Sequence, residues 1–295
     1  MKGIILAGGT GSRLFPITQA VSKQLAPVYD KPMIYYPLSV LMKAGIRDVL
    51  IISTPHDLPH FQQLFQDGAA LGLRLAYAAQ PRPQGIAQAL LIAADFVGQA
   101  PVTLILGDNL FFGEPVHNAL ALALSQPEQA HIFAQQVAEP ERFGVVAFDA
   151  AGQPSHIIEK PAQPPSDFAV TGLYVYPNSA LQRAQTLTPS ARGELEISDL
   201  NQAYLHQGQL CVHQLPASAT WFDTGTCDSL LAAGQFVAQT QQALSRTIAC
   251  LEIIAYKQGW LSMADLKAQA QPLRHSTYGH NLMRFIERQG AAHAD

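Results

Sequence analysis

The fold is decided near the amino terminus by the stretch Gly3-Ile4-Ile5-Leu6-Ala7-Gly8-Gly9-Thr10-Gly11-Ser12-Arg13-Leu14. Its short apolar run predicts a strand buried on both faces. Because the glycines that follow allow positive φ and close approach of a ligand, successive N–H groups can point at one oxyanion. The stretch predicts a phosphate-binding loop at the end of the first strand, although the glycines alone fit a plain strand–helix turn equally well.

Two cations of different geometry follow these glycines, the planar fork of Arg13 and the flexible point charge of Lys23. The G-x-x-x-x-G-K-[ST] pattern of a P-loop is absent. Leu14 stands where a dinucleotide fingerprint has its third glycine, and Ser53 and Thr54 stand where it wants an acid. The loop is therefore not that of a Rossmann dehydrogenase.

The composition indicates a chain that can bury a sizeable core. The sequence has 295 residues, of which 48% are hydrophobic and 14% charged, and its net charge is −4. This length predicts one large α/β domain, alone or with an appendage. With 18 lysines and arginines and no basic run, a nucleic-acid or anionic-membrane partner is disfavoured. An anionic ligand must then be held by a local concentration of cations.

The cysteines indicate a reducing compartment. Cys211, Cys227 and Cys250 are isolated in the sequence, with no C-x-x-C pair, which argues against a zinc site or a disulfide framework. The apolar runs are too short for a signal-peptide core or a membrane helix. We therefore expect a soluble protein in the cytoplasm.

Strand and helix patterns alternate along the first third of the chain. They predict helices over 32–44, 58–65 and 86–96, and strands over 49–52, 73–78 and 102–106. This alternation is typical of a mostly parallel sheet with right-handed crossovers, whose ligands bind beyond the carboxyl ends of the strands. The Gly8 loop, the stiff loop from Gln80 to Gly85, and Asp108 would then share one edge.

The remaining patterns change character towards the carboxyl terminus. They predict strands over 143–148, 154–160, 168–176 and 210–215, a helix over 198–206, a turn at 221–225 and a helix ending near 242. Short helices over 251–257, 263–270 and 278–287 and a tail over 290–295 follow. We expect these helices to pack as a subdomain on the sheet.

Seven separated blocks resemble, in order, the signature of the sugar-1-phosphate nucleotidylyltransferases. The first is the opening loop with Ser22-Lys23-Gln24-Leu25. The others are DKPMIYYPL at 30–38, GDNLFFG at 107–113, EKP at 159–161, VTGLY at 170–174, SARGELEI at 190–197 and WFDTG at 221–225. Together they are similar to the thymidylyltransferase members that act on glucose 1-phosphate, over the span from Gly3 to about Gly279.

The resemblance implies that dTTP and α-D-glucose 1-phosphate react, with Mg²⁺, to give dTDP-glucose and pyrophosphate, the first step of dTDP-L-rhamnose synthesis. Both reactants are anions, and at ~4 Å and an effective dielectric of ~20 each like-charge pair opposes their approach by ~4 kcal/mol. Cations and alignment are therefore the main requirement. A UTP-preferring uridylyltransferase and a non-catalytic sugar-nucleotide sensor are the alternatives.

The resemblance also implies roles for individual residues. The nucleotide would contact Leu6, Gly8, Gly9, Gly11, Ser12, Arg13, Lys23, Gln24, Gln80, Gly85 and Asp108, with Gln80 and Gly85 at the thymine edge. The hexose and its phosphate would contact Asn109, Gly144, Glu159, Lys160, Val170, Gly172 and Arg192. Asp108 and Asp223 would ligate Mg²⁺, a hard cation that bridges phosphate oxygens with few protein ligands. The expected catalytic residues are Arg13, Lys23, Lys160, Asp108 and Asp223.

The same resemblance implies how the chain is divided and assembled. A nucleotidyltransferase domain would span 1–242, with a nucleotide-binding part at about 1–113 and a sugar-binding part at about 114–242, followed by the helical subdomain and tail at 243–295. A homotetramer and a dTDP-sugar effector pocket between subunits are expected. Phe143 stands where the family usually has Tyr, so a hydroxyl contact to the sugar is lost there, and residues 251–259 depart most from the pattern.

Overall fold

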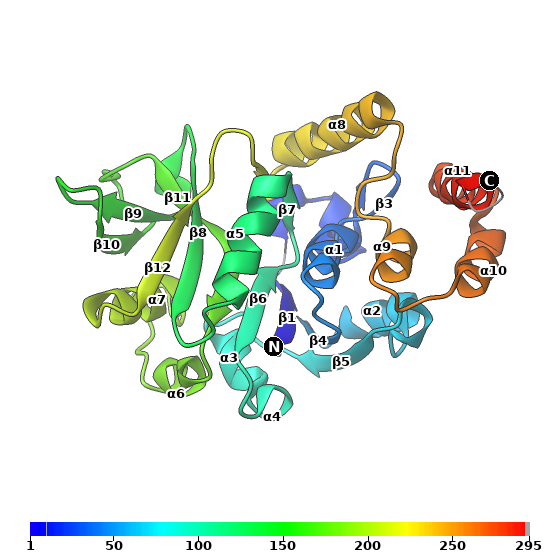
Figure 1. Cartoon of the computed structure of the whole chain (residues 1–295). Helices are drawn as coiled ribbons and strands as arrows, with labels where there is room; N and C mark the ends of the chain where they lie inside the picture. Colours follow the sequence, from blue (N-terminus) through cyan, green and yellow to red (C-terminus); the bar gives the residue numbers. More distant parts are fainter. Residues whose placement is uncertain (10, 293–295) are drawn as a thin grey trace.

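A nine-stranded sheet runs through the molecule in this computed structural model, which describes residues 1–9 and 11–292 (Figure 1). Its strands are β1 (Lys2–Ala7), β4 (Asp48–Ser53), β5 (Arg74–Ala79), β6 (Val102–Leu106), β8 (Ala130–Gln136), β9 (Gly144–Phe148), β10 (Pro154–Glu159), β11 (Phe168–Tyr176) and β12 (Leu210–Gln214). The main path is β10-β9-β11-β6-β1-β4-β5, and β8 joins β11 to β12. The predicted α/β class, with a large mostly parallel sheet between helices, is confirmed.

Strand β1 lies between β4 and β6 and is parallel to both. Its successive residues face opposite sides, since Ile4 belongs to one apolar core and Ile5 to the other, and neither is exposed. The predicted strand buried on both faces is therefore confirmed. The chain leaves β1 and β6 at the same edge of the sheet, where the Gly107 N–H donates to the Leu6 carbonyl at 2.9 Å.

Helices cover the two faces of the sheet. The helices of this part are α1 (Tyr35–Lys43), α2 (Leu58–Phe65), α3 (Gln88–Ile92), α4 (Ala94–Val97), α5 (Glu114–Leu124), α6 (Ser179–Gln185), α7 (Ile197–His206) and α8 (Cys227–Leu244). Side chains of α1, α2 and α5 pack in the core that contains Ile5, and those of α3, α4, α6 and α7 pack in the core that contains Ile4. Among the described residues, no helix is long and apolar enough to span a bilayer.

Three further helices form a group at the carboxyl terminus, on the side of the molecule away from β9 and β10 (Figure 1). They are α9 (Leu251–Lys257), α10 (Met263–Leu273) and α11 (Thr277–Ala292). Leu251 and Ile254 of α9 join the core around α1, while Leu266, Leu282 and Ile286 form a separate apolar cluster. The predicted short helices are confirmed, and residues 293–295 of the predicted tail lie outside the described residues.

Three predicted elements differ from the observed ones. The helix predicted over 32–44 begins at Tyr35, because Lys31–Pro32 (β3) pairs with Pro27–Val28 (β2) in a small ribbon. The helix predicted over 86–96 is broken at Ala93, where ψ is 0° and α3 gives way to α4. The turn predicted at 221–225 is largely the strand β13 (Thr220–Asp223).

Strand β13 pairs antiparallel with β7 (Asn109–Phe112), an element that the sequence patterns did not indicate. The register sets Trp221 opposite Phe111 and Asp223 opposite Asn109. Aromatic and apolar residues favour such pairing, so the tertiary partner overrides the local turn signal. This ribbon joins two segments more than a hundred positions apart at the edge where β6 ends.

Candidate active site

The glycine loop after β1 is packed against the loop from Gln80 to Gly85. Gly8 cannot be replaced without displacing Gln80, because a Cβ at Gly8 would lie 2.5 Å from the Gln80 side-chain oxygen. Gly85 adopts φ +99°, and a Cβ there would lie 2.3 Å from the Leu195 carbonyl oxygen. Gln24 reaches the Gly8 carbonyl at 3.4 Å. The structure thus brings together the nucleotide-binding residues expected from these separate loops.

A cavity of about 400 Å³ opens beside this loop at the carboxyl end of β6. Of the residues expected from the sequence, it is lined by Arg13, Asp108, Asn109, Gly144, Glu159, Lys160, Val170, Gly172 and Asp223. Arg13 comes from the loop after β1 and Asp108 from the turn between β6 and β7. The others come from the ribbon β7–β13, from β9 and β11, and from the end of β10. The expected sugar-binding and metal-binding residues therefore share one cavity, with Arg192 outside its lining.

The two aspartates are brought together by the β7–β13 ribbon. Asp108 precedes β7 and Asp223 ends β13, and the Thr224 N–H and hydroxyl both donate to the Asp108 carbonyl, at 3.2 and 2.7 Å. The Lys23 ammonium forms an ion pair with the Asp108 carboxylate. The sequence alone gave no reason to place Asp223 near Asp108, and the ribbon supplies that reason.

The two carboxylates differ in their affinity for a proton. Burial alone would raise the pKa of Asp108, but the Lys23 ammonium and hydrogen bonds outweigh burial and hold that pKa below its usual range. Burial raises the pKa of Asp223, as does the charge of Asp108, against the opposing effect of Lys23, Arg13 and Arg142. The pair concentrates negative charge in a confined space and therefore favours a bound cation.

Asn109 is the buried hub that fixes this region. Its Oδ1 accepts hydrogen bonds from the Gly172 N–H at 3.0 Å and from the Trp221 indole N–H at 2.6 Å. Its Nδ2 donates to the Asp108 carboxylate at 2.9 Å. Gly172 must be glycine here, because a Cβ would lie 2.5 Å from the Asn109 oxygen. One amide thus connects β11, β13 and the acidic pair.

Arg13 lies close to Asp223 because Gly225, which contacts both side chains, has no side chain of its own. A Cβ at Gly225 would lie 2.9 Å from a terminal nitrogen of Arg13 and 3.0 Å from a carboxylate oxygen of Asp223. The glycine loop and the end of β13 therefore meet at the cavity. A planar cation is placed next to a carboxylate, at the position where a phosphate could contact both Arg13 and a cation held by Asp223.

The opposite wall of the cavity carries Glu159 and Lys160. The Ser198 hydroxyl donates to the Glu159 carboxylate, and Gly144 leaves room for this bond, since a Cβ there would lie 2.8 Å from the Ser198 oxygen. Lys160 adopts φ +43°, a conformation that side-chain-bearing residues seldom take. Its N–H donates to the Phe143 carbonyl at 2.9 Å. Local backbone strain of this kind is found where a side chain must be aimed.

Arg192 lies beside the cavity with its guanidinium already engaged. It contacts both oxygens of the Glu196 carboxylate, at 2.9 and 2.8 Å, and it lies 3.3 Å from Glu159 and from Glu194. Its Nη2 donates to Glu159, so it bears on the carboxylate that the resemblance assigns to the hexose. In this structure Arg192 supports Glu159 more directly than it faces the cavity.

Several residues that line the cavity were not predicted as site residues, and three of them carry a charge or an aromatic ring close to the predicted residues. Arg142, Phe143 and Trp221 line the cavity, and the rings of Phe143 and Trp221 lie 5.2 Å apart. Trp221 belongs to a block that carried the resemblance, whereas the signal for Arg142 was only its position two residues before Gly144. The residue type alone could not identify Arg142 as a site residue, because isolated arginines are common.

The acidic pair suits a divalent cation that uses few protein ligands. Among the described residues, no group of three or more His, Cys, Asp or Glu side chains is placed to hold a metal. A site of two carboxylates needs no such group, since Mg²⁺ usually keeps waters and takes substrate phosphates as its other ligands. Asp108 and Asp223 offer oxygen donors of the right kind.

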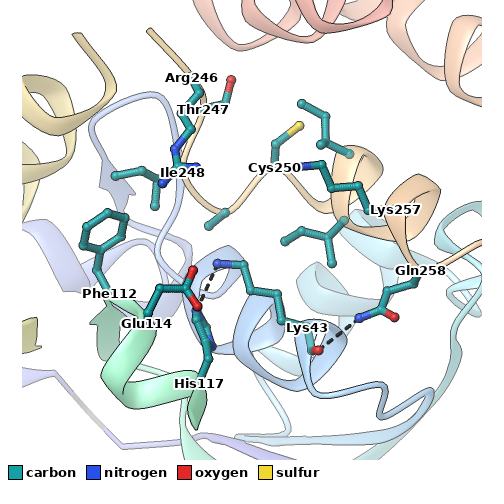
Figure 2. Close-up of a pocket in the computed structure, with 13 residues that line it drawn as sticks. Lys43, Phe112, Glu114, His117, Arg246, Thr247, Ile248, Cys250, Lys257 and Gln258 are labelled. Atoms are coloured by element: carbon teal, nitrogen blue, oxygen red, sulfur yellow. Dashed lines mark hydrogen bonds between the residues drawn. The ribbon is translucent and has the colours of Figure 1, made fainter. Parts of the chain in front are cut away.

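A second cavity, of about 410 Å³, lies between α1, the start of α5 and the segment that leads into α9 (Figure 2). Lys43 points into it beside Glu114 and lies 3.2 Å from a ring nitrogen of His117. Burial, together with Lys43, lowers the pKa of His117 to about 4, so that ring is neutral near pH 7. Arg246 and Lys257 add positive charge to the lining.

The two cavities share the strand β7. Asn109 at its start lines the first cavity and Phe112 at its end lines the second. The ring of Phe112 also packs edge-to-face against the ring of Phe236 in α8, with 5.5 Å between the ring centroids. Four consecutive residues therefore separate the acidic pair from the basic second cavity.

Comparison with known proteins agrees with the class that this fold and site indicate. A family model described as nucleotidyl transferase matches residues 2–240. A glucose-1-phosphate thymidylyltransferase from Neisseria gonorrhoeae is 54% identical over 286 residues, which is 97% of this chain and 99% of the relative. One from Mycobacterium tuberculosis is 48% identical over 288 residues, 98% of this chain and all of the relative.

Solved structures show the same likeness. A Bacillus anthracis structure described under the same enzyme name, in complex with a sucrose, is 41% identical, with a TM-score of 0.75 over 80% of this chain and 94% of that one. A UDP-glucose pyrophosphorylase complexed with UDP-glucose has a TM-score of 0.72 but 21% identity, over 81% of this chain and 98% of that one, and so shows the fold alone.

The fold, the glycine loop and the acidic pair define a nucleotidyl transferase. The chain belongs to the nucleotidyl transferase family and, within it, to the glucose-1-phosphate thymidylyltransferases. The family resemblance found in the separated sequence blocks is confirmed.

The hub role of Asn109 gives a test of stability. Asn109→Ala leaves the Gly172 N–H and the Trp221 indole without their acceptor, so we expect the free energy of unfolding to fall by ~1–3 kcal/mol. Urea denaturation followed by circular dichroism measures this change, and tryptophan emission should shift as Trp221 loses its partner. Asn118→Ala, at an exposed position of α5, is the control and should stay within ~0.5 kcal/mol. Equal stability of the two variants would contradict this role of the Asn109 side chain.

Proposed function

We propose that this chain transfers a deoxythymidylyl group from dTTP to α-D-glucose 1-phosphate, giving dTDP-glucose and pyrophosphate. One observation carries the proposal: Arg13, Asp108, Lys160 and Asp223 line a single cavity of about 400 Å³ at the end of the glycine loop. Two anionic substrates can meet only where cations offset their repulsion. The enzyme name of relatives that are 48% and 54% identical supports the choice of dTTP and glucose 1-phosphate.

The reaction is an in-line displacement at phosphorus. A phosphate oxygen of the sugar attacks the α-phosphorus of dTTP, and one P–O bond forms as the bond to the bridging oxygen of pyrophosphate breaks. The electron pair leaves on pyrophosphate, and the ionised nucleophile has no proton to lose. The chain's part is therefore to align the reactants and to stabilise the charge that moves to the leaving group.

We assign the ends of the substrates to the two walls of the cavity. The glycine loop, with Arg13 and Lys23, would hold the triphosphate, and Gln80 and Gly85 would contact the thymine. Lys160 would hold the sugar phosphate, with Arg192 as a second cation near it. The hexose would lie against Gly144, Glu159, Val170 and Gly172, with Glu159 accepting from its hydroxyls.

Asp108 and Asp223 would hold the divalent metal that this family generally uses, and we propose that it is Mg²⁺. When bound, such an ion neutralises charge on the phosphate oxygens. Lys23 would keep Asp108 ionised, since their ion pair lowers the pKa of that carboxyl. Asp223, whose pKa burial raises, gains a partner for its charge in the loaded site.

The donor specificity can be measured directly. With purified protein, we expect pyrophosphate release only when dTTP, glucose 1-phosphate and Mg²⁺ are all present, and a higher kcat/KM for dTTP than for UTP. Thymine differs from uracil by one methyl group, which is worth ~1–3 kcal/mol in a pocket, or about 10- to 200-fold. A preference for UTP would favour the uridylyltransferase alternative, and tight dTTP binding without turnover would favour the sensor.

The metal site predicts a separation of fold from activity. Asp223→Asn should lower kcat by more than ~100-fold, because the loss of an outer-sphere partner alone costs ~10–100-fold at metal sites. EDTA should abolish turnover of the unmodified chain. Asp228→Asn, at an exposed position in the first turn of α8, removes the same charge nearby and should retain kcat within twofold. An unchanged kcat for Asp223→Asn would remove Asp223 from the metal site.

The second cavity is our proposal for the dTDP-sugar effector site at a subunit interface of a homotetramer. Lys43, Arg246 and Lys257 suit the diphosphate of a nucleotide sugar, and Glu114 suits its hydroxyls.

In the proposal the catalytic domain spans 1–242 and the helical part 243–295, and α8 crosses this boundary to end at Leu244. The described cysteines are unpaired, which supports a reducing cytoplasm as the location.

Inhibition by the end product dTDP-L-rhamnose tests this site. Arg246→Gln should raise its inhibition constant about 10- to 100-fold, since a charge-assisted hydrogen bond contributes ~1.5–3 kcal/mol. Arg74→Gln, an exposed arginine paired with Asp48, is the control and should leave inhibition unchanged. Light scattering should give four times the chain mass of 31.9 kDa. Equal inhibition of both variants would place the effector elsewhere.

A further inference from the structure

A further cation lines the active-site cavity, besides Arg13 and Lys160. Arg142 ends the short turn Pro140–Arg142 and is followed, after Phe143, by β9. Its side chain faces the same cavity as Lys160 and Asp223. No role in the mechanism proposed above depends on it, although the reaction requires two anions to approach each other.

The position of Arg142 is set by elements that already belong to the site. Its guanidinium lies over the ring of Phe143, 5.6 Å from the ring centre, and that ring packs against Trp221 at 5.2 Å. The Phe143 carbonyl accepts the N–H of Lys160 at 2.9 Å. Phe143 therefore contacts both cationic residues, Arg142 through its ring and Lys160 through its carbonyl, on one rim of the cavity.

The ion pair of Arg142 is one that a substrate can displace. Arg142 donates to Glu139 at 2.7 Å, but the Glu139 side chain is 63% exposed, so water can take over its solvation. Arg192 is held differently: its main partner, Glu196, is 8% exposed and would be left buried without its cation. Of these two arginines, Arg142 is the one that faces the cavity and can be released at little cost.

We propose that Arg142 is a phosphate-binding residue of the sugar-phosphate site, where it exchanges Glu139 for the phosphate of glucose 1-phosphate and acts together with Lys160. The inference rests on the proposed function and names one more residue for the same site. A guanidinium binds a phosphate through two parallel N–H donors, whereas an ammonium binds as a point charge, so Arg142 adds orientation as well as charge. Together, Arg142 and Lys160 hold the phosphate that acts as the nucleophile, while Arg13 and Lys23 hold the triphosphate of the donor.

Arg142→Gln and Arg142→Lys test the proposal, with dTTP, glucose 1-phosphate and Mg²⁺ in steady-state assays and with glucose 1-phosphate alone in titration calorimetry. We expect Arg142→Gln to lower kcat/KM for glucose 1-phosphate about 10- to 100-fold, and the KM for dTTP to stay within threefold. Arg142→Lys should recover part of the loss, because the charge remains and the fork is gone. Added guanidinium ion should restore activity to Arg142→Ala.

Glu139→Gln separates a phosphate contact from a structural role. If Arg142 acts only by pairing with Glu139, the two neutral variants lose activity alike, and the proposal is wrong. If Arg142 binds the phosphate, Glu139→Gln frees the guanidinium and kcat/KM for glucose 1-phosphate stays equal or rises. Thermal unfolding of each variant shows whether the fold is kept.

The remaining outcomes are distinguishable. An active unmodified chain whose Arg142→Gln variant matches it within twofold, in both kcat/KM and affinity for glucose 1-phosphate, overturns the inference and leaves the proposed function in place. An unmodified chain that neither turns over nor binds glucose 1-phosphate overturns both. Binding without turnover that weakens in Arg142→Gln supports the inference and counts against the proposed function alone.

Discussion

The pairing of β7 with β13 is the constraint on which the site depends. It sets Asp223 opposite Asn109 and so delivers a carboxylate to Asp108 from a segment far along the chain. Without it Asp108 would be a polar residue at the end of a buried strand, with Lys23 as its partner. The pairing is locked by the Thr224 hydrogen bonds to the Asp108 carbonyl and by the buried amide of Asn109.

Charge is distributed in the cavity according to what the reaction needs. In the arrangement we propose, the donor end has the glycine loop and Arg13, the centre has two carboxylates of unequal pKa, and the acceptor end has Lys160 and Arg142. Alternating charge of this kind lets a chain with a net charge of −4 bind two anions. It also leaves the opposing charges in the cavity partly neutralised, which limits the cost of burying them.

The sequence predicted the parallel half of the fold well, because burial on both faces leaves a distinctive apolar run, as in β1 and β6. It failed where structure depends on a distant partner. Residues 221–225 carry turn-forming residues locally, yet residues 221–223 belong to a strand because β7 is there to pair with them. Likewise, the separate blocks named the candidate site residues one by one, but the nearness of Asp223 to Asp108 and the position of Arg142 at the cavity arise from tertiary contacts.

Strand β7 touches both cavities within four residues, and this sharing limits how the molecule can change. A substitution in β7 alters the surroundings of the acidic pair and the wall of the basic cavity together, so this strand cannot change one cavity alone. The wall of the basic cavity that includes Arg246, Ile253 and Lys257 comes from α9 and the segment before it, and lies outside β7. Substitutions in that wall can therefore reshape the basic cavity without altering the strand that carries Asn109.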